Sequence, residues 1–97
     1  MHDKNDIYRS AISQWGLDAQ ILMVAEEATE MAHAALKYNR HPNSETTGNF
    51  AEEIADCELM IEQMRLLPSL NKLIDEMKIK KLKRLESKLF GDDSNGQ

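Results

Sequence analysis

AQILMVAEEATEMAHAALKY, which spans residues 19–38, is the stretch that decides the fold of this chain of 97 residues. Before Lys37 its charged residues are Glu26, Glu27 and Glu30. A helix that is apolar nearly all round is a buried one. We therefore expect a central helix, capped by Asp18 and running to about Tyr38, that neighbouring helices cover.

Residues that break helices flank this stretch on both sides. A short helix over residues 6–14 is expected to end at Gly16, because a glycine after the last turn terminates a helix at low cost. Residues 39–49 contain Pro42 and Gly48 and have the composition of a loop. This loop would join the central helix to an antiparallel neighbour.

Two more helices are expected after the loop. Asn49 and Glu52 have the spacing of a capping box, so the third helix is expected to begin there and to end at Leu67, before Pro68. A fourth helix is expected over residues 70–90. The pattern predicts an all-α fold, a small antiparallel bundle of about four helices.

Length and composition fit one small ordered domain. Hydrophobic residues make up 41% of the chain, and it contains 2 prolines and 4 glycines. These values argue against a disordered segment and against a sheet protein rich in turns. We assign residues 1–90 to the domain and residues 91–97 to a polar tail.

Charge and cysteine content exclude several classes of protein. The formal net charge of −5 argues against binding to a nucleic acid polymer, which requires a basic surface. The single cysteine, Cys57, cannot form an internal disulfide, which fits a reducing, cytoplasmic setting. No run of about 18 apolar residues occurs, so neither a membrane span nor a signal peptide is expected.

The acidic residues of the third helix point in two directions, since a helix turns by about 100° per residue. Glu58, Glu62 and Arg65 form an ordinary solvated face. Glu53 precedes Glu62 by nine positions, or about 900°, and so lies opposite that face. Asp56 lies about 60° from Glu53. Both acids are therefore expected to face inward.

On the central helix, Glu27 and Glu30 repeat the i, i+3 spacing of Glu53 and Asp56. If the two helices are antiparallel neighbours, the acid pairs face each other. Two like charges about 4 Å apart repel by roughly 4 kcal/mol at an effective dielectric near 20, so the acids need protons, basic partners or a cation. An all-oxygen ligand set favours Mg²⁺ or Mn²⁺. The alternative is that these acids are solvated.

The same acids carry a family resemblance. The run Glu26-Glu27-Ala28-Thr29-Glu30, followed by Glu53-Ile54-Ala55-Asp56, resembles the EExxE…ExxD signature of the MazG-like all-α nucleoside triphosphate pyrophosphohydrolases. The likeness extends through Trp15-Gly16 and the segment of residues 81–85, and it covers roughly residues 10–90.

This resemblance implies an enzyme that depends on Mg²⁺ and cleaves a nucleoside triphosphate between the α and β phosphates, giving a monophosphate and pyrophosphate. The metal ligands that it implies are Glu27, Glu30, Glu53 and Asp56. Glu26 would be an outer or second-metal residue. Either Glu26 or Glu27 would orient the attacking water, and the sequence does not choose between them.

Basic residues are candidates for binding the phosphates. Lys81 and Arg84 continue the apolar stripe of the fourth helix and are the first candidates. Lys37, two turns beyond Glu30 on nearly the same face, is a weaker one. Many members of the family carry Asn at the position of Lys81, so the chain departs from the family there. The alternative is a solvated helix end whose charges complement the helix dipole.

Three other residues stand out. Trp15 is a candidate for stacking on the base, although an aromatic residue at the end of an amphipathic helix is more often a core anchor. His33 is interpreted as a packed or interface histidine, because no His or Cys partner has metal-ligand spacing with it. Cys57 is interpreted as a small core residue.

The leading hypothesis is a nucleotide-pool housecleaning enzyme that acts as a homodimer or homotetramer, because a buried central helix is hard to cover with three short helices of the same chain. One alternative is a non-enzymatic helical interaction or regulatory protein, which would leave the acid pairs unexplained. Another is a protein that binds nucleotide and hydrolyses it slowly. The sequence does not name the base or the sugar, or say whether one or two metals act.

Overall fold

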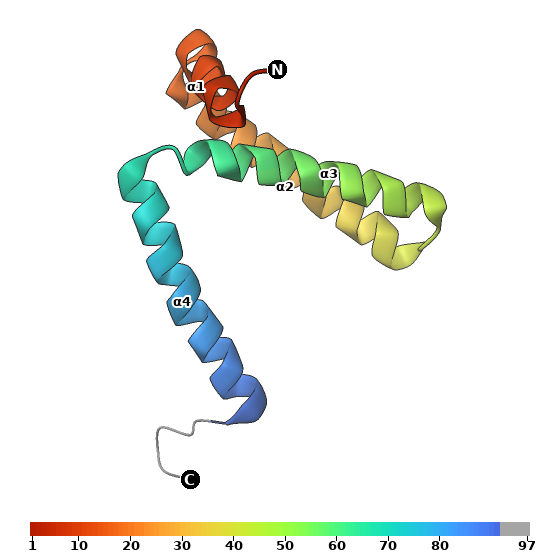
Figure 1. The fold of residues 1–97 in the computed structure, drawn as a ribbon. Helices are drawn as coiled ribbons and strands as arrows, with labels where there is room; N and C mark the ends of the chain where they lie inside the picture. The colour runs from red at the N-terminus through yellow and green to blue at the C-terminus, as the bar shows by residue number, and fades with distance from the viewer. Residues whose placement is uncertain (92–97) are drawn as a thin grey trace. The chain divides into compact units, whose positions relative to one another are not determined.

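The computed structural model describes residues 1–91, which form four helices and no strand (Figure 1). The helices are α1 (Lys4–Trp15), α2 (Leu17–Arg40), α3 (Ser44–Met64) and α4 (Pro68–Phe90). The all-α class with about four helices is thus confirmed. The chain divides into two compact units, Met1–Leu66 and a second unit that begins at Leu67. A single domain over residues 1–90 stays a prediction, and residues 92–97 of the expected tail lie outside the described residues.

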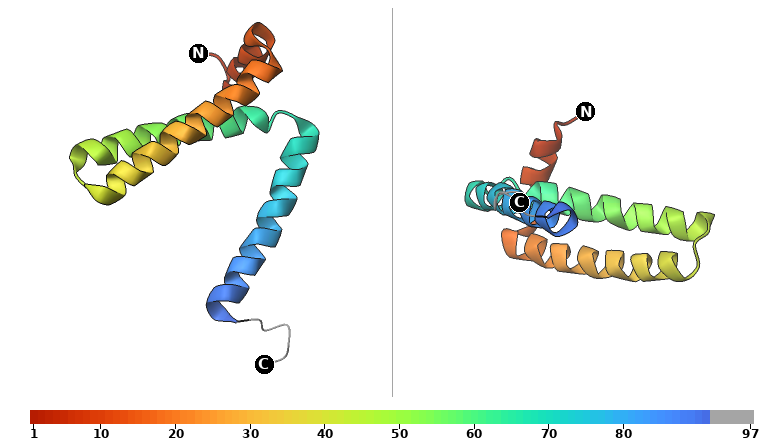
Figure 2. Two further views of the ribbon diagram at one scale, coloured as in Figure 1. Left: turned by 180° about the vertical axis from the view of Figure 1, so that it is seen from behind. Right: turned by 90° about the horizontal axis from the view of Figure 1, so that it is seen from below.

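Helices α2 and α3 form an antiparallel hairpin and lie side by side along their lengths (Figures 1 and 2). Near the connection, Tyr38 packs on Phe50 with ring centroids 5.5 Å apart. At the opposite end, the buried side chain of Gln63 donates a hydrogen bond to Gln20. A side-chain contact therefore joins α2 to α3 at each end of the hairpin, and the acids lie between these two contacts.

The expected loop over residues 39–49 is wrong in its extent, because α3 begins at Ser44. Asn43 is the N-cap: its side chain accepts a hydrogen bond from the Thr46 backbone at 2.9 Å, and the Thr46 hydroxyl accepts one from the Asn43 backbone at 3.0 Å. The polar residues that gave this stretch a loop composition fill the first turns of the helix. A cap at Asn43 rather than Asn49 lengthens the helix toward the connection.

The expectation that α2 is buried is also wrong within the single chain. Among the described residues, its buried side chains are Gln20 and Ala34. Ile21 and Leu36 are exposed, by 48% and 59%. Helices α1 and α3 contact α2, and within residues 1–91 an apolar side of α2 that includes Ile21 and Leu36 is left exposed.

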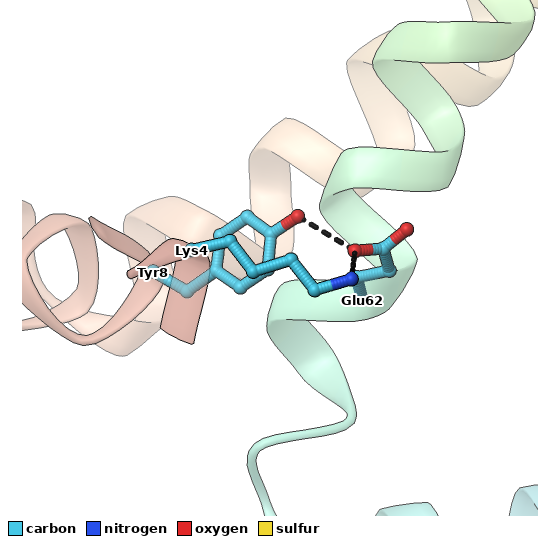
Figure 3. A network of polar contacts seen from close by, with 3 residues as sticks. All are labelled: Lys4, Tyr8 and Glu62. Atoms are coloured by element: carbon cyan, nitrogen blue, oxygen red, sulfur yellow. Dashed lines mark hydrogen bonds and ion pairs between the residues drawn. The ribbon is translucent and has the colours of Figure 1, made fainter. Parts of the chain in front are cut away.

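Helix α1 packs against the hairpin through a polar contact that the helix phase did not predict (Figure 3). The buried Tyr8 donates a hydrogen bond from its hydroxyl to Glu62 Oε1 at 2.8 Å, and Lys4 Nζ lies 3.2 Å from the same oxygen. These contacts lower the pKa of Glu62, the Tyr8 hydrogen bond most. Glu62 is therefore not simply part of a solvated face. The turn from α1 to α2 uses Gly16 at φ +90°, a conformation that other residues rarely adopt.

In the second unit, α4 starts at Pro68, two residues before the expected start, and ends before Gly91. Proline suits the first turn of a helix because its missing N–H has no partner there. None of the side chains of α4 is buried in the part of the chain that the structure describes. No helix within residues 1–91 combines the length and the apolar character needed to cross a bilayer.

Candidate metal centre

Three acids from two helices converge on one point of the hairpin. Glu27 and Glu30 are one turn apart on α2, and Glu53 faces them from α3; one carboxylate oxygen of each lies within 4.8 Å of the others. Glu27 and Glu53 are half-buried, whereas Glu30 is exposed. We call these three residues the acid cluster. Their convergence is part of the arrangement that the i, i+3 spacing predicted, in which Asp56 was the fourth acid.

Asp56, the fourth ligand implied by the resemblance, lies beside the acid cluster. It is half-buried, one turn after Glu53 on α3. Its negative charge contributes to the raised pKa of both Glu27 and Glu53. Its oxygens are not among those that converge within 4.8 Å, so a role as ligand stays a prediction.

Burial and mutual repulsion raise the pKa of two of the acids. For Glu27 the largest cause is burial, followed by the charges of Glu30, Asp56 and Glu26. For Glu53 it is again burial, followed by the charge of Glu30 and a hydrogen bond with it. Both acids therefore hold a proton to a higher pH than an ordinary glutamate does.

Two buried carboxylate oxygens of the acid cluster lack hydrogen-bond partners among the described residues, which is compatible with a bound cation. Oε2 of Glu27 and Oε2 of Glu53 are buried and have no hydrogen-bond partner within residues 1–91. A buried polar atom without a partner is costly and calls for an explanation. The ion pairs of Lys4 with Glu62 and of Arg9 with Asp6 do not reach these oxygens. A donor set made entirely of carboxylate oxygens fits Mg²⁺ or Mn²⁺.

A cavity of about 250 Å³, which we call the polar cavity, adjoins the acid cluster on the side of the α2–α3 connection. Its side chains are polar or charged, apart from one alanine. The polar members are Glu30, His33, Lys37, Thr46, Asn49 and Glu53. The structure thus brings Lys37 to the acids, while its role in phosphate binding stays a prediction.

His33 is exposed in the single chain and lines the polar cavity, so it is not packed in the core, and a place at a subunit interface stays a prediction. The sequence pattern did not indicate Thr46 or Asn49 as residues that line the site. Helix phase would have found two of these residues: His33 follows Glu30 by three positions, and Asn49 precedes Glu53 by four.

A second, larger hollow of about 790 Å³ lies among α1, α2 and α3. We call it the apolar hollow. Its members include Trp15, Leu22, Met23, Glu26, Leu59 and Met60. Trp15 is 62% exposed, so it is not a core anchor. Stacking of Trp15 on a base and a catalytic role for Glu26, which is exposed at the edge of this hollow, stay predictions.

The remaining phosphate-binding candidates, Lys81 and Arg84, are exposed residues of α4 in the second unit. Cys57 is buried, as expected for a core residue. Burial and the charges of the four neighbouring acids raise its pKa, which makes the thiol less reactive.

The chain was compared with family models, with curated proteins and with solved structures, and none of these comparisons gave a match. The likeness of the acid motif to the MazG-like enzymes therefore stays a resemblance.

Proposed function

We propose that this chain is a nucleoside triphosphate pyrophosphohydrolase that requires Mg²⁺, or Mn²⁺ in its place, and cleaves its substrate between the α and β phosphates. The observation that carries the proposal is the acid cluster with the buried, unpartnered oxygens of Glu27 and Glu53. A purely structural role would leave these two buried oxygens without a partner. The spacing of the acids along both helices agrees with the same chemistry.

Glu27, Glu30 and Glu53 would hold the metal, with Asp56 completing the ligand set. When bound, the metal supplies the positive charge that allows a triphosphate to approach carboxylates and that stabilises the departing pyrophosphate. The protein contributes fixed carboxylates on two packed helices, so that little reorganisation is needed.

Glu26 or Glu27 would orient the attacking water and accept its proton. Glu26 has the freer position, because it is exposed and lies outside the acid cluster. Glu27 would be occupied as a ligand. We therefore assign the water to Glu26 and expect Glu26→Gln to lower turnover while Mg²⁺ binding is retained.

The uncovered side of α2 supports a homodimer or homotetramer. Ile21, Ala25, Ala28, Ala32 and Leu36 recur on that side, and all five are exposed in the single chain. Small residues let two helices approach closely. Exposed apolar area also fits the second candidate, a non-enzymatic interaction protein.

Release of pyrophosphate tests the proposal directly. The folded protein is incubated with a panel of normal and damaged nucleoside triphosphates in the presence of Mg²⁺, with Glu53→Gln as the inactive control. We expect release from at least one nucleotide. No release from any of them, together with no Mg²⁺ binding by calorimetry, would favour the interaction protein.

A further inference from the structure

The acid cluster lies between two hollows of opposite character. The polar cavity is lined by residues 30–37 of α2 and residues 46–53 of α3, and the apolar hollow by residues 19–26 and 59–63 of the same helices with α1. Helices α2 and α3 run antiparallel (Figure 1). The residue ranges that line the apolar hollow, the acid cluster and the polar cavity therefore follow one another along the hairpin in that order. A molecule held at the cluster can extend one end into each.

The polar cavity offers groups that are ready to bind an anion. Lys37, His33 and Asn49 make no hydrogen bond or ion pair through their side chains in the part of the chain that the structure describes. Thr46 differs, because its hydroxyl already donates to the His41 carbonyl at 2.8 Å. Lys37 therefore brings an unpaired positive charge, and His33 and Asn49 bring further polar atoms.

The apolar hollow cannot take the same ligand group. A phosphate placed among Leu22, Met23 and Leu59 would lose its hydration without gaining a partner. The exposed ring of Trp15 instead suits a planar aromatic group, which stacks on it whatever its hydrogen-bonding pattern. The two ends of a nucleoside triphosphate thus match different hollows.

We infer that the polar cavity seats the pyrophosphate end of the substrate, with Lys37 on the β and γ phosphates, and that the nucleoside extends toward Trp15. This inference rests on the proposed function and adds the direction of the substrate along the hairpin. Lysine binds phosphate as a point charge, and charge builds up on the leaving group during phosphoryl transfer. Lys37 is placed where that charge would appear.

With the substrate in this orientation, the bonds, electrons and protons of the cleavage balance. The water oxygen bonds to the α phosphorus, and the bond between this phosphorus and the α–β bridging oxygen breaks. The bridging oxygen leaves with the electron pair as part of pyrophosphate, at the side of Lys37. The proton of the water passes to Glu26 and from there to solvent.

Direct binding of the two products tests the inference with the full chain. Inorganic pyrophosphate and a nucleoside monophosphate are each titrated calorimetrically, with Mg²⁺ present, into wild type, Lys37→Met and Trp15→Ala. Arg40→Ala is the matched control, since Arg40 is also an exposed basic residue near the end of α2 and does not line the cavity. Lys37 is exposed, so its replacement leaves the fold intact, which thermal unfolding verifies.

We expect Lys37→Met to weaken pyrophosphate binding on the order of tenfold, the loss of one charge-assisted contact, and Trp15→Ala to weaken only monophosphate binding. Arg40→Ala should change neither. Pyrophosphate binding that is absent from wild type, that does not depend on Lys37 or that depends on Trp15 would overturn the inference. Turnover measured in parallel separates the two proposals: turnover without dependence on Lys37 refutes only the inference, and dependence on Lys37 without turnover refutes only the catalysis.

Discussion

Glu53 is the residue at which stability and metal binding oppose each other. Its pKa is raised by burial and by Glu30, so its charge is unfavourable at neutral pH without a cation. We expect Glu53→Gln to raise the melting temperature in the presence of a chelator and to abolish stabilisation by Mg²⁺. Differential scanning calorimetry with and without Mg²⁺ measures both effects.

The neighbouring Glu52 provides the control, because it is exposed and has the same charge. Glu52→Gln should leave the melting temperature and the Mg²⁺ effect nearly unchanged. A lower melting temperature for Glu53→Gln in chelator, with the Mg²⁺ effect retained, would show that the acid cluster is not a metal centre.

The raised pKa values of Glu27 and Glu53 also fix how stability depends on pH. The folded state binds these protons more tightly than the unfolded state, so stability decreases as the pH rises from about 4.3 through the folded-state pKa values. Urea unfolding in chelator between pH 4 and 8 should show this decrease. Saturating Mg²⁺ should reduce it, because the cation replaces the protons.

Glu62 changes the pH dependence of stability in the opposite direction and at lower pH than Glu27 and Glu53 do. Tyr8 and Lys4 lower its pKa, so its contribution is present at neutral pH and is lost only as the pH falls below the ordinary glutamate value. A decrease of stability above about pH 4.3 therefore cannot come from Glu62. A profile that is flat above that pH in chelator would contradict the raised pKa values.

At this scale the sequence predicted that four acids converge, from helix phase together with the antiparallel pairing of the two helices, and the structure brings three of them, Glu27, Glu30 and Glu53, together. The sequence did not predict the contact of Glu62 with Tyr8. That contact depends on where α1 packs, which no periodicity within α3 encodes. The exposure of His33 was missed for a similar reason, since the surroundings of one helix face depend on the neighbouring helix.

The start of α3 differs most from the prediction, because Asn43 and not Asn49 is the N-cap. The contribution of this cap to stability can be measured. The Asn43 side chain satisfies one of the free N–H groups of the first turn. Replacing an asparagine N-cap with alanine costs about 1 kcal/mol. We expect Asn43→Ala to lower the free energy of unfolding by about that amount, as measured by urea denaturation.

Asn39→Ala is the matched control, because Asn39 is an exposed asparagine within α2 and not a cap. It should leave stability unchanged or raise it slightly, since alanine is the better helix former. An equal loss in both variants would show that the Asn43 cap contributes nothing beyond the loss of an asparagine.

The helices themselves were predictable and their ends less so. Periodicity gave all four, because apolar positions recur at helical spacing. The start of α3 was missed because asparagine, threonine and glycine indicate a loop by composition, whereas the reciprocal hydrogen bonds of Asn43 and Thr46 make a cap of the same residues. Local composition does not distinguish a loop from a capped first turn.

For the whole molecule, the feature that differs from the prediction is the exposed apolar side of α2. Its apolar composition predicted burial, yet the chain by itself leaves Ile21 and Leu36 exposed. Burial of such a face contributes about 25 cal/mol per Å² of apolar area, which a second copy of the chain would supply. The proposed homo-oligomer would therefore cover the apolar side of α2 that the single chain leaves exposed.

Ala28 lies near the middle of that uncovered face and is exposed in the single chain. A glutamate there is tolerated by a monomer but would place a charge inside a helix–helix interface without a partner. We expect wild type to scatter light as two or four copies of the 11.1 kDa chain, and Ala28→Glu to scatter as one. Mg²⁺ binding should persist in the variant, because Ala28 points away from the acid cluster. A wild-type monomer at micromolar concentration, or an assembly unaffected by Ala28→Glu, would mean that α2 keeps its apolar side for a different partner.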